Sequence, residues 1–312
     1  MIFNLLVIVA PVFLMIACGY FAAFKGWMSR EAIEGLMRFA QGFAIPCLLF
    51  NAVMTLDLGG VFEWRLLASF YTGSIACFVM AMFVSRLLFG RRPGESVVVG
   101  FGALFSNSVL LGLPITERAF GADALAPNYA IVSLHAPICY LLGVVVMEFS
   151  RADGKAISDT LREAFLSLSK NPLMIGIGLG FVANVTGLSL WQPVQAWLDM
   201  AARAALPVAL FGLGAVLTRY QISKQVKEPM MVIGFSLLVH PTLTWTLCTQ
   251  VFELPIEFTR SAVVTAAMAP GINAYLFANM YQRAQDVAAN AVLLGTAFSV
   301  LTASAWLLIL GV

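Results

Sequence analysis

Apolar runs long enough to cross a bilayer recur along the whole chain, separated by short charged or turn-rich stretches. A spanning helix needs about 20 mostly apolar residues. The charged content of 11% is far below the roughly 25% of a globular chain. The sequence therefore predicts an all-α integral membrane protein. Ten runs are expected to be transmembrane helices: 3–24, 33–55, 63–89, 97–119, 127–150, 171–190, 197–218, 229–252, 259–281 and 287–310.

The basic residues predict how these helices are oriented. Lys and Arg concentrate in cytoplasmic loops. Most of the 18 Lys and Arg residues fall in loops that lie inside if the N-terminus is outside. We therefore expect a multi-pass protein of the plasma membrane, which in bacteria is the inner membrane, with both termini outside.

Composition and motifs argue against several function classes. The five cysteines lie in apolar runs without metal-ligand spacing, so we expect neither a disulfide framework nor a metal site. The sequence contains no HExxH, GxSxG or Walker A motif, which argues against a membrane enzyme and against an ATP-driven pump. No basic run indicates nucleic-acid binding. We expect no catalytic residue and no cofactor.

Helix-breaking residues interrupt the fourth and ninth runs. Each run combines a proline, a glycine and an asparagine: Asn107, Gly112 and Pro114 in 97–119, and Pro270, Gly271 and Asn273 in 259–281. Proline removes a backbone donor, and in lipid the freed polar groups cannot turn to water. Such a break is tolerated where it is buried in protein or lines a polar cavity, so both breaks predict a binding site at membrane depth. Lone prolines in other runs predict simple kinks: Pro11, Pro46, Pro137, Pro207 and Pro241.

The order of the runs divides the chain into two halves of five helices. Residues 1–150 form the first repeat, 151–170 a cytoplasmic linker and 171–312 the second repeat. With an odd number of helices in each half, the second half enters the membrane from the opposite side, so the repeat must be inverted. The two breaks then lie at corresponding positions.

In order and spacing, these residues resemble the auxin efflux carrier family, which includes plant PIN exporters and bacterial carriers labelled malonate or organic-acid transporters. The resemblance covers the whole chain. It rests on Asn107, Gly112, Pro114, Pro270 and Asn273, together with the segments around Pro46 and Pro207. The chain departs from the family at Val109, where relatives often have glycine.

The resemblance implies a fold like that of bile-acid symporters and sodium/proton antiporters, in which broken helices 4 and 9 cross. It implies a scaffold made of helices 1, 2, 6 and 7, and a transport domain made of helices 3–5 and 8–10. It also implies elevator-type movement, carboxylate substrates and a homodimer formed through the scaffold.

Two crossing breaks would direct the N-termini of two half-helices at one point. Each terminus behaves like roughly half a positive charge, so together they favour an anion without a buried lysine. Asn107 and Asn273 would add amide donors to a carboxylate, or would instead satisfy the unwound backbone. The other candidates for substrate binding lie around them: Ser106, Ser108, Gly112, Pro114, Pro270 and Gly271.

Two histidines lie inside apolar runs beside prolines, His135 in the fifth and His240 in the eighth. Either could accept a proton near neutral pH and couple transport to a proton gradient. Alternatively, each bonds the helix backbone loosened by the proline. The acids fall at ends or loops of the predicted runs, so no carboxylate relay is indicated.

The sequence predicts a secondary transporter of small organic anions, carboxylates such as auxin-like indole acids or malonate, working by elevator-type alternating access. The alternative is a channel or a membrane receptor that binds a carboxylate on the same scaffold. Saturable uptake stimulated by countertransport distinguishes the carrier. The expected partners are the carboxylate, the lipid bilayer and a second copy of the chain.

Overall fold

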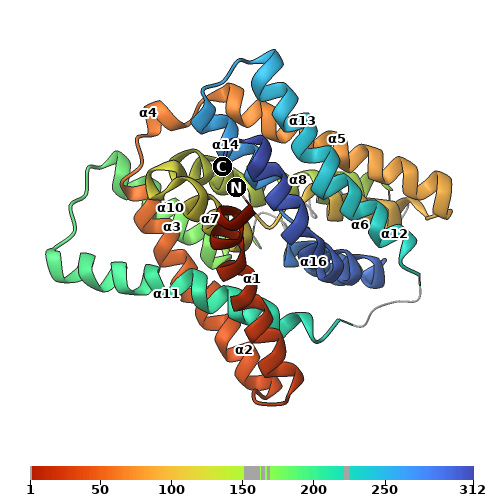
Figure 1. The fold of residues 1–312 in the computed structure, drawn as a ribbon, viewed down its shortest axis with the longest axis horizontal. Helices are drawn as coiled ribbons and strands as arrows, with labels where there is room; N and C mark the ends of the chain where they lie inside the picture. The colour runs from red at the N-terminus through yellow and green to blue at the C-terminus, as the bar shows by residue number, and fades with distance from the viewer. Residues whose placement is uncertain (1, 151–161, 163–165, 167–168, 221–224) are drawn as a thin grey trace. The chain divides into compact units, whose positions relative to one another are not determined.

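The computed structural model describes residues 2–150, 162, 166, 169–220 and 225–312, with side chains from residue 5 onward. These residues form helices and contain no β-strand (Figure 1). Helix contacts divide the chain into two compact units. Unit 1 comprises Met1–Ala10, Phe62–Ala164 and Tyr220–Val312, and unit 2 comprises Pro11–Val61 and Phe165–Arg219. Most of the predicted linker 151–170 lies outside the described residues.

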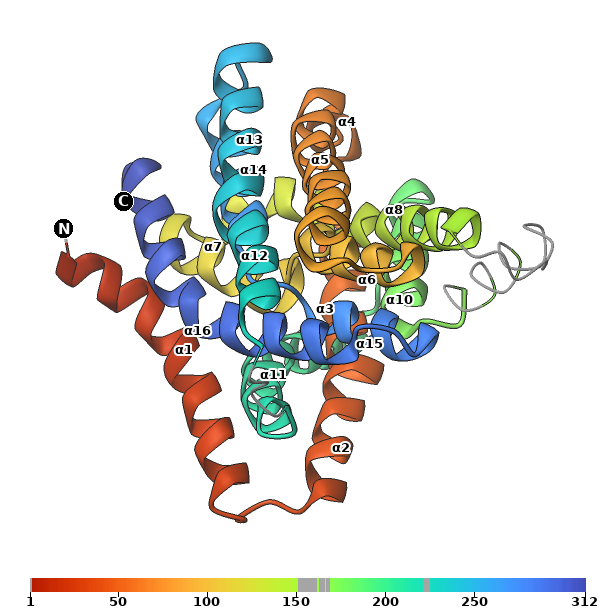
Figure 2. The same cartoon turned by 90° about the vertical axis from the view of Figure 1, so that its right-hand side faces the viewer.

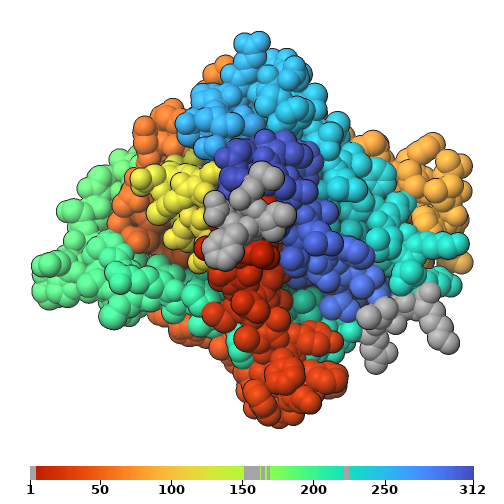
Figure 3. Space-filling model, in the orientation of Figure 1, coloured from red at the N-terminus to blue at the C-terminus, as the bar shows by residue number. Residues whose placement is uncertain are grey.

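Unit 1 contains the start of α1 (Ile2–Phe24) and the helices of two later segments, Phe62–Ala164 and Tyr220–Val312. These are α5 (Trp64–Phe89), α6 (Pro93–Leu104), α7 (Leu113–Phe120), α8 (Ala126–Ser150), α12 (Lys227–Gly234), α13 (His240–Thr246), α14 (Ile256–Ala266), α15 (Ile272–Tyr281) and α16 (Gln285–Ile309). Helix α5 packs against α6 and α13, and the two views agree on this arrangement (Figure 2). Helices α12 and α16 pack together and form adjoining surfaces in the space-filling view (Figure 3).

Unit 2 contains the rest of α1 and a second set of helices. These are α2 (Arg30–Phe39), α3 (Ile45–Met54), α4 (Leu58–Val61), α10 (Pro172–Val185) and α11 (Gln192–Leu217). Helix α10 packs along α3 through two glycines. A β-carbon at Gly176 or Gly180 would lie 2.6 Å from the Pro46 carbonyl oxygen or 2.9 Å from that of Phe50. Small residues four positions apart therefore set this close backbone approach.

Seven helical segments in the described chain are long and apolar enough to cross a membrane, which confirms the prediction of an all-helical chain with many membrane-length helices. They are Leu5–Phe24, Arg30–Met54, Trp64–Phe89, Ala122–Ser150, Gln192–Leu217, Lys227–Val251 and Gln285–Ile309. The other three predicted runs lack a continuous helix of that length. Run 171–190 forms α10, with 14 residues, and runs 97–119 and 259–281 are interrupted.

Three prolines follow a widened helical turn. A five-residue π turn ends two residues before Pro46, Pro114 and Pro241, and the residue preceding each proline donates its amide five residues back. Proline clashes with the carbonyl four residues back, and the wider turn relieves that crowding. The expected simple kinks at Pro46 and Pro241 are therefore π turns. The remaining lone prolines lie inside continuous α-helices: Pro11, Pro137 and Pro207.

Candidate functional site

Two helix interruptions in unit 1 meet through their backbones. Helix α6 ends at Leu104, and helical structure resumes at the π turn Ser108–Gly112; α14 ends at Ala266, and α15 begins at Ile272. An isolated antiparallel bridge joins Ser106 to Pro270. Its two hydrogen bonds run from the Asn107 amide to the Ala269 carbonyl, 2.8 Å, and from the Gly271 amide to the Phe105 carbonyl, 2.9 Å. The interruptions thus stabilise each other.

Carbonyl groups at the interruptions have donors. The Leu104 carbonyl accepts from the Ser74 hydroxyl of α5, with 3.0 Å between the oxygens. The Met268 carbonyl accepts from the Ser236 hydroxyl at 3.1 Å. Backbone amides supply donors to three more carbonyls, those of Phe105, Ser106 and Ala269. Acceptors that the broken helices released are therefore largely used within the protein.

Amide donors at the same place are not used. The first amides of a helix lack partners within the helix and form the positive end of its dipole. Among the described residues, nothing accepts a hydrogen bond from the amides of Val109, Ile272 and Asn273. The site therefore combines filled acceptors with open donors, an arrangement that suits an anion.

Asn107 adds a side-chain donor beside these amides. It caps the π turn through Oδ1, which accepts from the Leu110 amide at 3.3 Å. Its Nδ2 atom is buried, as is the Ser106 hydroxyl, and neither has a hydrogen-bond partner in the described part of the chain. Burying an unpaired polar group costs about 1–3 kcal/mol. An acceptor supplied by a ligand would remove that cost.

Asn273 lies near the start of α15 and is partly buried. Its Oδ1 atom accepts from the Tyr140 hydroxyl of α8, with 3.2 Å between the oxygens. Within the described residues, its Nδ2 group has no acceptor. Asn273 thus has two open donors within the described chain, its side-chain Nδ2 group and its main-chain amide.

The remaining predicted residues divide into two groups. Pro270 and Gly271 lie in the bridge, and buried Ser108 begins the π turn directly after it. Gly112 ends that turn, and Pro114 lies in the first turn of α7. Unwinding thus occurs at 105–107, before Gly112 and Pro114. Whether these residues bind a substrate remains a prediction.

The two histidines are fully buried in unit 1 and face the same phenyl ring. Their rings lie 5.6 Å (His135) and 4.9 Å (His240) from the ring of Phe70. His240 Nε2 donates to the Phe70 carbonyl at 3.3 Å, a backbone group of α5 and not of the helix that contains Pro241. His135 Nδ1 lies 3.6 Å from the sulfur of Cys139, and the His135 ring is 4.6 Å from that of Phe105 at the interruption. Proton coupling by either histidine remains a prediction.

A buried polar cluster beside the site was not identified from the sequence. Asn128 Nδ2 donates to Thr265 Oγ1 at 2.7 Å, to Thr116 Oγ1 at 3.3 Å and to the Ser261 carbonyl at 3.4 Å. All four residues are buried. The cluster ties α7, α8 and α14 together next to the interruptions.

Unit 2 contains an acid within a membrane-length helix that was not recognised from the sequence. Asp199 lies at the start of the predicted run 197–218, but α11 begins earlier, at Gln192, so that Asp199 lies inside the helix. Its Oδ1 atom accepts from Asn51 Nδ2 at 3.0 Å and from Gln195 Nε2 at 2.9 Å. A polar triad thus joins α3 to α11. The sequence signal that could have identified this triad was an acidic residue, Asp199, within a predicted apolar run.

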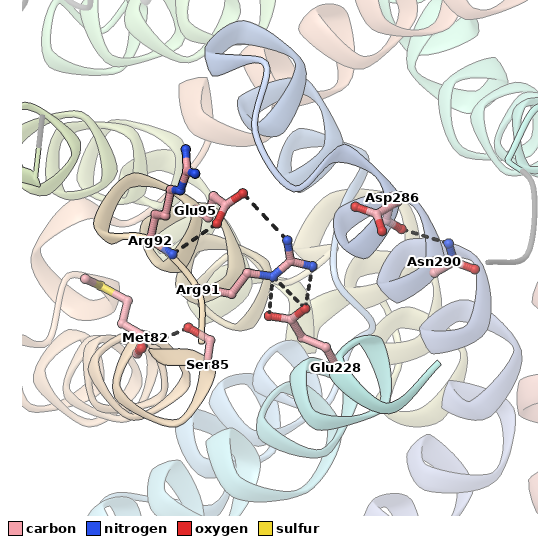
Figure 4. Close-up of polar contacts among 8 residues, drawn as sticks. All are labelled: Met82, Ser85, Arg91, Arg92, Glu95, Glu228, Asp286 and Asn290. Atoms are coloured by element: carbon pink, nitrogen blue, oxygen red, sulfur yellow. Dashed lines mark hydrogen bonds and ion pairs between the residues drawn. The ribbon is translucent and has the colours of Figure 1, made fainter. Parts of the chain in front are cut away.

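Charged residues of unit 1 gather where α5, α6, α12 and α16 end or begin (Figure 4). Arg91 donates from Nη2 to Glu228 Oε2 at 2.7 Å and from Nε to both oxygens. The hydrogen bonds to Glu228 raise the pKa of the Arg91 guanidinium above its ordinary value. Glu95 lies 3.7 Å from the same guanidinium. In the described chain, no three His, Cys, Asp or Glu residues are grouped to hold a metal ion.

Comparison with protein families assigns the chain to a family. A family model described as membrane transport protein, the model of the auxin efflux carrier family, matches residues 5–307. The chain belongs to this family. It is accordingly a multi-pass integral membrane transporter rather than an enzyme, and it handles a small-molecule substrate in a lipid bilayer.

Known relatives of this auxin efflux carrier family member cover nearly the whole chain. A protein of Rhizobium meliloti (strain 1021) named "Putative malonate transporter" is 21% identical over 295 residues, which are 95% of this chain and 92% of the relative. An "Uncharacterized transporter" of Methanothermobacter thermautotrophicus is 23% identical over 304 residues, 97% of each chain. The "Lysosomal cholesterol signaling protein" of Mus musculus is 24% identical over 322 residues, 94% of this chain but 36% of the relative.

Proposed function

We propose that this auxin efflux carrier family member is a secondary transporter of small organic anions, and that it binds a carboxylate at the two joined interruptions. One observation carries the proposal: carbonyls there have donors, whereas the amides of Val109, Ile272 and Asn273 lack acceptors in the described chain. A cation would need the reverse arrangement, with open oxygen atoms.

Charge at the site also favours an anion. Two helix N-termini each contribute roughly half a positive charge, and the effect is strongest where water is excluded. The side-chain donors of Ser106, Asn107 and Asn273 would complete a shell of neutral hydrogen-bond donors around a carboxylate. Such a site needs no buried Lys or Arg, so the empty state carries no unpaired buried charge.

Matching contacts at the two interruptions support an inverted repeat of five and five helices. Ser74 of the first half donates to Leu104, and Ser236 of the second half donates to Met268. In each half, a serine from the preceding long helical segment thus bonds the carbonyl two residues before the bridge residue, Ser106 or Pro270. We propose that broken helices 4 and 9 cross here, as in the bile-acid symporter and sodium/proton antiporter fold.

The division into two compact units supports elevator-type alternating access. Both interruptions belong to unit 1, and unit 2 contains the close glycine contact between α3 and α10. We propose that unit 1 carries the substrate and that unit 2 is the scaffold. Export of an anion would be assisted by an inside-negative potential, by about 2.3 kcal/mol per charge per 100 mV.

The name of the Rhizobium meliloti relative favours malonate among the carboxylates, with auxin-like indole acids as the second class. We place the protein in the plasma (bacterial inner) membrane with both termini outside, and we propose a homodimer. His135 or His240 would carry the proton if transport is proton-coupled. These proposals depend on the anion site, which is tested first.

Uptake by reconstituted liposomes tests the site. Purified protein should accumulate radiolabelled malonate saturably, and unlabelled malonate on the other side should stimulate uptake. Asn107→Ala and Asn273→Ala should each reduce uptake at least tenfold, since each removes one donor from a water-excluded site. Asn279→Ala is the matched control, because the exposed side chain of this α15 residue bonds only Gln282 and Gln285 among the described residues.

Three results would contradict the proposal. Normal uptake by both site variants would remove the anion site from the interruptions. Conductance that does not saturate with concentration, without countertransport, would favour the channel, and binding without uptake would favour the receptor.

A further inference from the structure

We propose that Tyr140 is a positioning residue that keeps the Asn273 amide turned with its donor toward the anion. This inference rests on the proposed function, because it assumes that Asn273 contacts a carboxylate. It begins from a single contact: the Tyr140 hydroxyl lies 3.2 Å from Asn273 Oδ1. The two residues come from α8 and α15, helices that lie far apart in the sequence.

Neighbouring rings hold Tyr140 in place. Its ring centroid lies 5.4 Å from that of Phe101, 5.8 Å from Phe105 and 6.2 Å from Phe277. Phe101 and Phe277 stack on each other at 3.9 Å, and both are fully buried. Phe277 also lies one helical turn after Asn273 on the same helix. The ring cluster thus fixes the hydroxyl against the end of the Asn273 side chain.

An asparagine amide has two ends of nearly equal shape and opposite hydrogen-bonding character. Its last torsion is broad and roughly two-fold, so rotation that exchanges oxygen and nitrogen meets little intrinsic resistance. If oxygen faced the ligand, it would repel a carboxylate. A hydroxyl donated to Oδ1 directs Nδ2 the other way and polarises the amide, which strengthens donation by Nδ2.

This arrangement predicts selectivity for charge. A carboxylate offers only acceptors, so it binds only the orientation that presents Nδ2. A primary amide of the same shape offers a donor and an acceptor, so it can pair with either orientation. Loss of the Tyr140 hydroxyl should therefore weaken the binding of a carboxylate much more than the binding of its amide.

The experiment compares five carboxylates with their primary amides by titration calorimetry: acetate, malonate, succinate, benzoate and indole-3-acetate. Tyr140→Phe keeps the ring and its packing while removing the hydroxyl. In this variant we expect the affinity for the tightest-binding carboxylate to fall about tenfold and the affinity for its amide to fall less than threefold. To present Nδ2 to a carboxylate, Asn273 must then keep Oδ1 against the rings without a hydrogen-bond donor.

Tyr129→Phe is the matched control. Tyr129 is also partly buried on α8, and its hydroxyl makes no hydrogen bond to another described residue. This variant should leave the ratio of the two affinities unchanged. An equal change in that ratio for both tyrosine variants would overturn the proposal.

Further outcomes separate this inference from the proposed function. Unchanged affinities in Tyr140→Phe, or equal weakening of carboxylate and amide binding, would overturn the role of Tyr140. The proposed function would still stand if Asn273→Ala abolishes binding. If Asn273→Ala binds normally, or if the wild-type protein binds none of the five carboxylates, the anion site itself fails and the inference fails with it.

Discussion

The main-chain amide of Asn107 donates to the main-chain carbonyl of Ala269 across 2.8 Å. This bond joins segments from opposite halves of the chain and, with its partner from Gly271 to Phe105, forms the bridge between the interruptions. Because the bridge uses backbone groups only, the side chains of Ser106 and Asn107 take no part in it. Substitutions of these two side chains therefore leave the hydrogen bonds of the bridge in place.

Gly271 tests the bridge. Its φ of −75° suits any residue, and a β-carbon would meet its nearest atoms at 3.5 Å, an ordinary contact. We expect Gly271→Ala to change the free energy of unfolding by less than about 0.5 kcal/mol. Gly271→Pro removes the amide and leaves the buried Phe105 carbonyl unpaired, so we expect a loss of about 1–3 kcal/mol. Unfolding in detergent measures both, and equal stability of the two variants would show that the bridge contributes nothing.

Asn128 tests the buried polar cluster. Asn128→Ala removes the bonds to Thr116, Ser261 and Thr265 and leaves their oxygens without that donor. We expect the free energy of unfolding to fall by about 2–3 kcal/mol. Exposed Asn279→Ala should change it by less than about 0.5 kcal/mol. A loss below about 1 kcal/mol in Asn128→Ala would contradict a stabilising role for the cluster.

The two interruptions could be anticipated because their signal is local. Pro270 and Gly271 in an apolar run conflict with a continuous helix whatever surrounds them. The exact point of unwinding in run 97–119 could not be anticipated. Asn107, Gly112 and Pro114 together indicated an interruption over 107–114, but a π turn accommodates Pro114, and the chain unwinds at 105–107.

The contacts that complete the site depend on distant segments. Tyr140 and Asn273 are 133 residues apart, and Arg91 and Glu228 are 137 apart. Neither pair follows a periodic pattern, so a single sequence gave no indication of them. Asp199 was missed for another reason. It lies at the very start of run 197–218, where an acid is expected to face the membrane surface, whereas α11 begins at Gln192 and includes Asp199 in its interior.

Arg91 and Glu228 form an ion pair whose acid is nearly buried. The Glu228 side chain is 6% exposed and that of Arg91 is 21% exposed. Arg91→Met would leave the carboxylate without its cation, so we expect a loss of about 2–4 kcal/mol. The double variant Arg91→Met/Glu228→Met should be more stable than Arg91→Met alone, because it leaves no unpaired charge. Exposed Arg92→Met is the control, with little change expected.

The same pair predicts how stability depends on pH. The pKa of Arg91 is raised, so its contribution is fully present below the ordinary arginine pKa and is lost only as pH rises through the raised value. Titration of Arg91 should therefore leave the free energy of unfolding unchanged between about pH 6 and 9. A difference between wild type and Arg91→Met that disappears within this range would contradict the assignment.

The two histidines predict different responses to pH. His135 lies against Phe105 at the interruption, whereas His240 bonds the Phe70 carbonyl. If protons are coupled, His135→Gln should flatten the dependence of uptake between about pH 5 and 8, and His240→Gln should leave it in place. Glutamine keeps a hydrogen-bond donor but does not titrate. Profiles unchanged in both variants would exclude coupling through either histidine.

Asn107 has two functions that one substitution can separate. Its Oδ1 atom caps the π turn through the Leu110 amide, while its Nδ2 atom is the buried open donor. Asn107→Asp keeps the capping oxygen and replaces the donor with a second acceptor, whereas Asn107→Ala removes both. At a helix N-terminus an aspartate caps about as well as an asparagine, so Asn107→Asp should be about 0.5–2 kcal/mol more stable than Asn107→Ala.

Carboxylate binding should nevertheless be weaker in Asn107→Asp than in Asn107→Ala, because the introduced carboxylate repels the ligand. Calorimetry and thermal unfolding measured on both variants decide this, and tighter carboxylate binding by Asn107→Asp than by Asn107→Ala would contradict a donor role for Asn107.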